Sequence, residues 1–288
     1  MSARPASDDP WRINADLHCH SRASDGTLAP AELVRRAQAN GVELFALTDH
    51  DELAGLAEAQ AAARDAGLAF LPGVEVSVTW ADATIHVVGL GIDPQDATLS
   101  AGLAALRAGR SGRAREMGAQ LARAGVDGAY EGALAVAGNP ALLSRTHFAR
   151  FLVDQGVCED VHDVFRRFLV EGKPGFVPHR WARLSDAVGW IRGAGGTAVM
   201  AHPGRYALDD LRRWALFSEF REAGGEAIEV VTGSHTRDEY AIYARHARDF
   251  GFQASRGADF HDPGESRMDL GRLPLLPDSV EPVWRRWT

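Results

Sequence analysis

The sequence predicts an α/β fold, either a barrel or a parallel sheet, with a functional site at the ends of its strands. Three observations favour this prediction. Short apolar runs alternate with helical stretches in the first and last thirds of the chain. Most of these runs lead directly into a cluster of His, Asp or Glu residues. Such clusters converge when they follow the strands of a barrel or a parallel sheet, because functional residues gather at the strand C-termini.

The first strand is predicted at residues 13–20, which contain Asp16, His18 and His20. Successive side chains of a strand point to opposite faces, so the carboxylate and both imidazoles are expected on one face. These three groups make half of a metal site, whereas Cys19 should point away and pack in the core. A His-x-His pair alone is more often structural, so the later clusters decide the matter.

Alternating helices and strands follow in the first part of the chain. Pro30 suits the first turn of a helix, and Gly67 suits the end of the next one. Valines alternate with Glu75 and Ser77, which is typical of a strand with one polar face. The predicted elements are a helix at 30–40, a strand at 43–48, a helix at 53–66, and strands at 68–71, 74–78 and 84–90.

The strand pattern disappears between residues 99 and 173 and then resumes. Helices are expected at 99–106, 113–124, 146–155 and 161–170, with glycines in the connections. The last part predicts helices at 184–194, 208–223 and 237–250, strands at 197–201, 227–231 and 252–255, and a proline-rich surface tail at 273–288. We therefore predict an N-terminal tail (1–12), a first barrel part (13–98), an inserted helical subdomain (99–173), and a second barrel part with the C-terminal tail (174–288).

Composition narrows the class of function. The chain has 288 residues and a net charge of -8, so it is a poor candidate for binding long duplex DNA, which requires phosphate neutralisation. Two cysteines without a Cys-x-x-Cys motif argue against a disulfide framework and a zinc ribbon. No apolar run approaches the ~20 residues of a membrane span, and the N-terminal residues lack the apolar core of a signal peptide. We expect a cytoplasmic protein.

The polar residues at the strand ends form one constellation. Its members are Asp16, His18, His20, Asp25, Asp49, His50, Asp51, Glu75, His86, His202, Asp259 and His261. Imidazole and carboxylate ligands without thiolate favour Mn²⁺, Fe²⁺ or Zn²⁺. One ion cannot use this many ligands, so we expect two or three ions that share a bridging carboxylate. Such an arrangement is suited to the hydrolysis of phosphate esters.

These motifs resemble those of the PHP (polymerase and histidinol phosphatase) family. The resemblance rests on Asp-x-His-x-His at 16–20, Thr-Asp-His-Asp at 48–51, Gly-Val-Glu at 73–75, Ala-His-Pro at 201–203 and Gly-Ala-Asp-Phe-His at 257–261. It implies a distorted (β/α)₇ barrel of the amidohydrolase-like type with three metal ions. Mn²⁺ is expected, with Zn²⁺, Fe²⁺ or Mg²⁺ as alternatives.

The resemblance also implies the role of each ligand. His18, His20, Glu75 and Asp259 would hold one ion, Asp25, His50 and His261 a second, and Glu75, His86 and His202 a third. Asp25 and Glu75 are the predicted catalytic residues, with Glu75 as the bridge. Asp16 and Asp49 would orient imidazoles from behind.

Residues 144–150 further resemble the branch of the family that acts on nucleotides. The implied activity removes the 3′-phosphate from nucleoside 3′,5′-bisphosphates and can also trim short 5′-phosphorylated RNA from its 5′ end. Candidate substrate contacts are Arg110, Arg113, Arg145, His147, Lys173 and Arg205, for which surface or helix-cap roles are the alternatives. Two other functions stay open, a histidinol-phosphate phosphatase and a non-catalytic regulatory metal-binding module.

Overall fold

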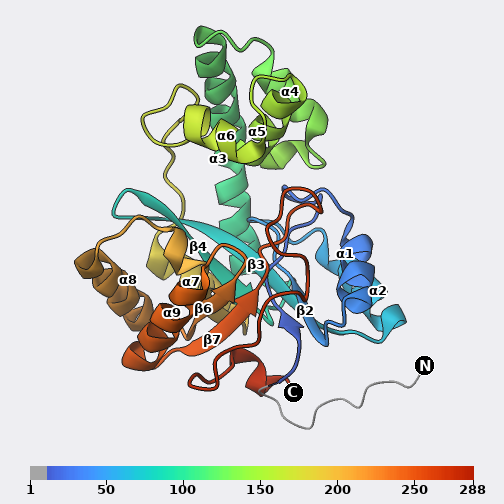
Figure 1. Ribbon diagram of the computed structural model, residues 1–288, viewed down its shortest axis with the longest axis vertical. Helices are drawn as coiled ribbons and strands as arrows, with labels where there is room; N and C mark the ends of the chain where they lie inside the picture. Colours follow the sequence, from blue (N-terminus) through green and yellow to red (C-terminus); the bar gives the residue numbers. More distant parts are fainter. Residues whose placement is uncertain (1–11) are drawn as a thin grey trace.

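The computed structural model describes residues 12–288, and its centre is a mixed sheet that nearly closes into a barrel (Figure 1). Within this range the strands, which pair in chain order, are β1 (Ala15–Asp16), β2 (Leu44–Leu47), β3 (Ala69–Trp80), β4 (Ala83–Leu90), β5 (Thr197–Met200), β6 (Ala227–Thr232) and β7 (Gln253–Gly257). Only the β3–β4 and β4–β5 pairs are antiparallel. The predicted α/β barrel is confirmed. Of the predicted N-terminal tail, residues 1–11 lie outside the described range.

The barrel closes where the chain beyond β1 meets the chain beyond β7. Asp259 N donates a hydrogen bond to His18 O (2.8 Å), and Cys19 pairs with Phe260 in an isolated parallel bridge. The strand predicted at 13–20 is longer than the observed β1, which has only the two residues Ala15 and Asp16. Asp259 has a φ of 54°, which interrupts a regular ladder at this point.

The strand β3 replaces two predicted strands, at 68–71 and 74–78. Its first four residues pair in parallel with β2 and the rest pair antiparallel with β4. Pro72 lies at this change of partner, so the N–H that it lacks is not needed for a continuous ladder. At Gly73 the neighbouring chains approach closely, because a Cβ atom there would lie 2.9 Å from the carbonyl oxygen of Gly89.

Helices cover the outside of the barrel: α1 (Pro30–Ala39), α2 (Leu56–Ala66), α7 (Leu184–Gly193), α8 (Asp210–Glu222) and α9 (Arg237–Phe250). Local sequence fixes their ends. Glu32 accepts a hydrogen bond from Ala29 N (2.7 Å) at the start of α1. Gly67 ends α2 in the left-handed conformation, with a φ of 65°, as its position predicted.

A single long helix, α3 (Ala97–Arg123), rises from the barrel into a separate group of helices, which we call the cap (Figure 1). Two shorter helices at 99–106 and 113–124 were predicted here, and this prediction is wrong. Gly109 and Gly112 lower helix propensity, but Leu103 packs in the barrel core and Leu121 in the cap core, and this packing at both ends stabilises the helix between them.

The rest of the cap consists of α4 (Ala129–Val136), η1 (Pro140–Leu142), α5 (Arg145–Asp154), α6 (Val161–Val164) and the π-helical turn η2 (Phe165–Leu169). Helix α4 was not predicted, because Gly128 and Gly132 suggested a loop. Gly132 instead allows close packing, since a Cβ atom there would lie 2.1 Å from the Phe151 ring. The cap has its own apolar core. The exact division of the chain at residues 99 and 173 stays a prediction.

The C-terminal tail packs into the barrel core. Val283 and Trp284 are buried in the 3₁₀ helix η4 (Val283–Arg286), so the predicted surface location is wrong for these residues. Ala254 N donates to Glu281 O (2.7 Å), which attaches the tail to β7. The 3₁₀ helix η3 (Pro203–Arg205) follows β5. None of the helices in the described range is both long and apolar enough to cross a bilayer.

Two glycines of α3 provide a test of how the cap is joined to the barrel. A Cβ atom at Gly112 would meet nothing within 4 Å, whereas one at Gly102 would lie 2.6 Å from the Trp190 ring. We expect Gly112→Ala to raise the free energy of unfolding by about 0.5–1 kcal/mol. Gly102→Ala should lower it by about 1–3 kcal/mol through overpacking. Chemical denaturation measures both, and equal effects would contradict this packing.

Candidate metal centre and substrate cavity

The polar residues at the strand ends converge around the carboxylate of Glu75, which lies on β3 and is completely buried. Five imidazoles surround its two oxygens. The distances from Glu75 are 2.8 Å to His50 Nδ1, 3.1 Å to His202 Nε2, 3.2 Å to His86 Nδ1, and 3.3 Å to the Nε2 atoms of His18 and His20. His86 was grouped with the strand ends but lies within β4. It reaches the cluster because β4 runs antiparallel to β3.

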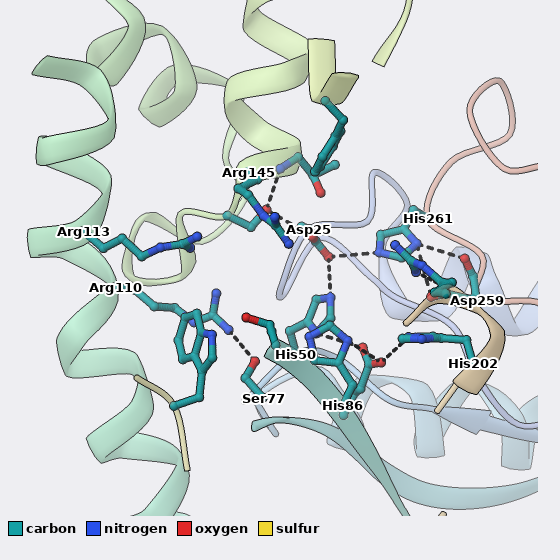
Figure 2. A pocket seen from close by; sticks show the side chains of 17 residues that line it. Asp25, His50, Ser77, His86, Arg110, Arg113, Arg145, His202, Asp259 and His261 are labelled. Carbon is teal, nitrogen blue, oxygen red and sulfur yellow. Dashed lines mark hydrogen bonds and ion pairs between the residues drawn. The ribbon is translucent and has the colours of Figure 1, made fainter. Parts of the chain in front are cut away.

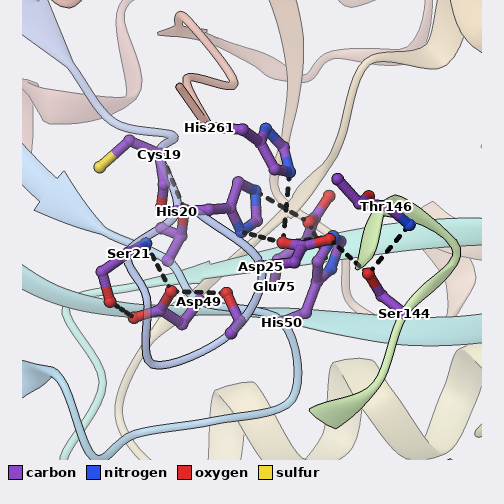
Figure 3. Close-up of polar contacts among 12 residues, drawn as sticks. Cys19, His20, Ser21, Asp25, Asp49, His50, Glu75, Ser144, Thr146 and His261 are labelled. Atoms are coloured by element: carbon purple, nitrogen blue, oxygen red, sulfur yellow. Dashed lines mark hydrogen bonds and ion pairs between the residues drawn. The ribbon is translucent and has the colours of Figure 1, made fainter. Parts of the chain in front are cut away.

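Two further carboxylates complete the cluster. Asp25 Oδ1 lies 3.4 Å from His261 Nε2 and 3.9 Å from His50 Nε2 (Figure 3). Asp259 Oδ1 lies 3.2 Å from His20 Nε2 and 3.6 Å from His261 Nδ1. All nine residues predicted as metal ligands are therefore together in one cluster.

Burial and neighbouring charges together set the pKa values in this cluster. Burial alone would raise the pKa of Glu75, but the fields of His86, His50 and His18 lower it well below its ordinary value. Burial lowers the pKa of His20 to about 3, with a further contribution from His261 and His50. Burial opposes protonation of His50, but Glu75 and Asp25 raise its pKa to about 9. The carboxylates thus stay ionised and able to bind cations.

The donor atoms fit divalent metal ions. Among the described residues, the buried atoms without a hydrogen-bond partner include His20 Nδ1, Asp25 Oδ1 and His202 Nδ1. Buried polar atoms are rarely left without a partner, so several together favour a site that binds cations.

The same donors fall into overlapping groups that could each hold an ion. In residues 12–288 these groups, each with donor atoms within 4.8 Å of one another, are His20–Asp25–His50–His261, His18–Glu75–His202, His18–His20–Asp259 and His50–Glu75–His86. The groups share Glu75 and three imidazoles, as expected for several ions close together. Which residue holds which ion stays a prediction.

Asp16 and Asp49 support backbone, so the prediction that they orient imidazoles is wrong. Asp16 accepts hydrogen bonds from Ala258 N (2.9 Å) and Gly271 N (2.7 Å). Asp49 accepts from Ser21 N (2.7 Å) and from the Ser21 and Ser24 hydroxyls, which fixes the loop that carries Asp25 (Figure 3). Both carboxylates thus fix backbone segments that carry candidate metal ligands.

The residue that orients an imidazole is Glu229, on β6, which the sequence reasoning missed. Its Oε1 lies 2.8 Å from His18 Nδ1, and its Oε2 accepts a hydrogen bond from His202 N (2.6 Å). Glu229 is buried within the apolar run Ala-Ile-Glu-Val-Val. A lone acidic residue in a buried strand was the only available signal.

A cavity that is open to solvent lies between the cluster of candidate ligands and the cap (Figure 2). Arg110 and Arg113 reach it from α3 and Arg145 reaches it from α5. Arg205, at the end of η3, also lines it. These four arginines had been predicted as substrate contacts. Arg113 is the first residue of the helix predicted at 113–124, but both Arg110 and Arg113 lie in the middle of α3.

Neighbouring groups fix two of these arginines. The buried Arg110 pairs with Asp51 and donates to Ser77 Oγ (3.1 Å), and its guanidinium stacks over Trp181 at 4.5 Å. Arg113 Nε donates to Val177 O (3.0 Å). Both side chains are thus held at the cavity wall before any ligand arrives.

The guanidinium groups repel one another. Burial lowers the pKa of Arg113 to about 9, and the charges of Arg145 and Arg110 add to this effect. Burial likewise lowers the pKa of Arg145, together with the charges of Arg205 and Arg110. A phosphate dianion among them would relieve this repulsion and accept several charge-assisted hydrogen bonds.

The other two predicted substrate contacts lie outside the lining of this cavity. His147 is buried at the start of α5, where its Nδ1 accepts a hydrogen bond from Ser144 N (3.1 Å), and burial lowers its pKa to about 4. Lys173 is exposed in the connection after η2. Lining residues that were not predicted include Ser144, Thr146, Phe165 and Trp181.

Comparison with known proteins relates this site to a family. The model of the family described as the PHP domain matches residues 16–169. The chain is 54% identical to a 3′,5′-nucleoside bisphosphate phosphatase of Chromobacterium violaceum, over 94% of this chain and 95% of that protein. It is 42% identical to a 5′-3′ exoribonuclease of Haemophilus influenzae, over 94% of this chain and 98% of that protein.

A solved structure agrees with these sequence matches. An amidohydrolase of Chromobacterium violaceum, described with bound sulfate and no metal, superimposes with a TM-score of 0.93. The two chains are 53% identical, and the match covers 95% of each. The shared fold therefore includes the barrel and the cap.

Removing the charge of Glu229 tests its role. We expect Glu229→Gln to weaken divalent metal binding about 10- to 100-fold, because His18 loses the carboxylate that orients its ring. Titration of the metal-free protein with Mn²⁺ measures this change. Glu226→Gln is the control, since Glu226 pairs with Arg286 away from the cluster. Equal affinities in the two variants would contradict the role of Glu229.

Proposed function

This chain belongs to the PHP domain family, and we propose that it is a metal-dependent phosphoesterase that removes the 3′-phosphate from nucleoside 3′,5′-bisphosphates. One observation carries the proposal: a cluster of imidazoles and carboxylates faces an arginine-lined cavity. A substrate with two phosphates can place one at the cluster and the other among the arginines. The bisphosphate phosphatase of Chromobacterium violaceum, which is 54% identical, supports this substrate class.

We assign the metal site to His18, His20, Asp25, His50, Glu75, His86, His202, Asp259 and His261. Two or three divalent ions, with Mn²⁺ as first choice, would lower the pKa of the attacking water and neutralise charge on the phosphate and the leaving oxygen. Zn²⁺, Fe²⁺ and Mg²⁺ are the alternatives, because each also binds imidazole or carboxylate ligands and they differ in which of the two they prefer.

Asp25 and Glu75 are the carboxylates that we assign to catalysis. Glu75 lies between the imidazole groups and links them. Asp25 lines the cavity, and its Oδ2 accepts a hydrogen bond from Ser144 Oγ (3.0 Å). Its buried Oδ1 faces His261 and His50, so this atom would hold the ion that activates the attacking water.

The arginines of the cap wall would recognise the 5′-phosphate of the substrate. Arg110 and Arg113 are held in place by their neighbours, and Arg145 stands at the start of α5, where the helix dipole also favours an anion. Binding of the 5′-phosphate here would leave the 3′-phosphate at the metal cluster. This arrangement would set the position of cleavage relative to the 5′ end.

The same arrangement extends to short 5′-phosphorylated RNA. The 3′-phosphodiester of a terminal nucleotide occupies the place of the 3′-phosphate in a bisphosphate, so one site can serve both substrates. The 42% identical relative named as a 5′-3′ exoribonuclease supports this extension. A cytoplasmic location and the exclusion of long duplex DNA stay predictions.

Two alternatives predict different behaviour. A histidinol-phosphate phosphatase needs no second phosphate site, so it would not explain the arginines that line the cavity. A non-catalytic metal-binding module would not need an open cavity beside its ligands. The complete ligand cluster also argues against a module that has lost its activity.

Product analysis provides the first test. We expect Mn²⁺-loaded protein to convert 3′-phosphoadenosine 5′-phosphate into AMP and phosphate, and the metal-free protein to be inactive. Chromatography of the nucleotide product distinguishes AMP from adenosine 3′-phosphate. Release of the 5′-phosphate would contradict the proposed orientation. Hydrolysis of histidinol phosphate alone would favour the first alternative, and full metal loading without hydrolysis the second.

The arginine wall provides the second test. We expect Arg145→Ala to lower kcat/KM for the bisphosphate roughly 10- to 100-fold, the range of a lost charge-assisted hydrogen bond. Its activity on adenosine 3′-phosphate, which lacks the 5′-phosphate, should change much less. Arg123→Ala is the control, because Arg123 is exposed on α3 and pairs with Glu116. Equal losses on both substrates would remove the argument for a 5′-phosphate site.

A further inference from the structure

One arginine of the cap contacts both loops that carry Asp25 and His261. Arg150 lies on α5, and its Nε and Nη2 each donate to Glu265 at 2.8 Å. Its Nη1 donates to the carbonyl oxygen of Asp25 at 2.6 Å. Glu265 follows His261 in the loop after β7. A single guanidinium thus joins the cap to two separate segments of the barrel.

The two loops also contact each other beside this arginine. Thr27 N donates to His261 O (2.9 Å), and Thr27 Oγ1 donates to Asp262 Oδ2 (2.6 Å). The Asp25 and His261 side chains belong to the same group of donor atoms, together with His20 and His50. The separation of the two loops therefore sets the distance between two donors of one candidate ion site.

The same helix holds the Asp25 side chain as well as its backbone. Ser144, at the N-cap of α5, donates to Asp25 Oδ2 at 3.0 Å (Figure 3). Arg150, six residues after Ser144, donates to the backbone carbonyl of Asp25. Because one helix and its N-cap hold Asp25 at both its side chain and its backbone, a movement of that helix would also move the Asp25 carboxylate.

An ordinary surface ion pair would explain these contacts less well. Such pairs contribute little and usually join two exposed side chains. Here the Arg150 side chain is 11% exposed, its contact with Glu265 is bidentate, and its third nitrogen is used by a backbone carbonyl. Burial opposes the charge of Arg150, but its hydrogen bond with Glu265 and the Glu265 charge raise its pKa, so it stays protonated.

We propose that Arg150 is a positioning residue that sets the metal affinity of the His20–Asp25–His50–His261 group and thereby couples the cap to the metal centre. This inference rests on the proposed metal site. Without the arginine, the Asp25 and His261 loops keep the Thr27 contacts but lose the bridge from the cap, so two donors of the ion between them become less fixed together. The ligands on other strands, His18, Glu75, His86 and His202, would keep their geometry.

Metal analysis of Arg150→Met tests the proposal. We expect this variant to retain about one equivalent of Mn²⁺ fewer than the unmodified protein after equilibrium dialysis at limiting Mn²⁺. The affinity for that ion should fall roughly 10- to 100-fold. High Mn²⁺ should restore both occupancy and kcat. A misfolded variant would show no such rescue. The control is Arg166→Met, which removes an exposed ion pair with Asp163 elsewhere in the cap.

Two further variants keep the test decisive if Arg150→Met does not fold. Glu265→Gln removes the bidentate partner at a partly exposed position and should lower the affinity for the same ion in the same direction. Combined with Arg150→Lys, it should give less than additive losses, because both changes break one contact. Additive losses, or unchanged Mn²⁺ binding in every variant, would overturn the inference. Absence of Mn²⁺ from the unmodified protein would instead overturn the proposed metal site.

Discussion

The structure depends on keeping the Glu75 carboxylate charged in a completely buried position. An isolated carboxylate in such a position would be strongly destabilising. Five imidazoles within 3.3 Å offset this cost, and the charges of Glu75 and Asp25 in turn raise the pKa of His50 to about 9. Metal ions would compete with protons for these imidazoles, so metal affinity and protonation are linked at this centre.

Three residues at the strand ends near the ligand cluster have strained backbone conformations. Asp51, His202 and Asp259, which follow β2, β5 and β7, have φ values of 49°, 27° and 54°. Such angles are unfavourable for residues other than glycine and persist only where surrounding contacts fix them. Glu229 provides one such contact, because it binds His202 N and the His18 ring together. It therefore supports two strained or crowded ligands from behind.

The sequence predicted what local spacing determines. Alternation within β3 and the short motifs near the strand ends indicated a constellation of twelve residues that contains all nine candidate ligands, and the resemblance to the PHP family selected the nine. Glu229 was missed because its importance depends on packing against His18, which is 211 residues away. The continuity of α3 across Gly109 and Gly112 was missed for a similar reason. Its two ends are stabilised by different cores, which no local pattern reveals.

Helix α5 relates the two halves of the site physically. Its first residue, Arg145, lines the substrate cavity, while Ser144 and Arg150 hold the side chain and backbone of Asp25. A rigid helix cannot move one of these contacts without the others. An anion that shifted α5 on binding Arg145 would therefore also act on the Asp25 carboxylate at the ligand cluster. Substrate recognition and metal geometry share one rigid element, so a change in either is expected to alter the other.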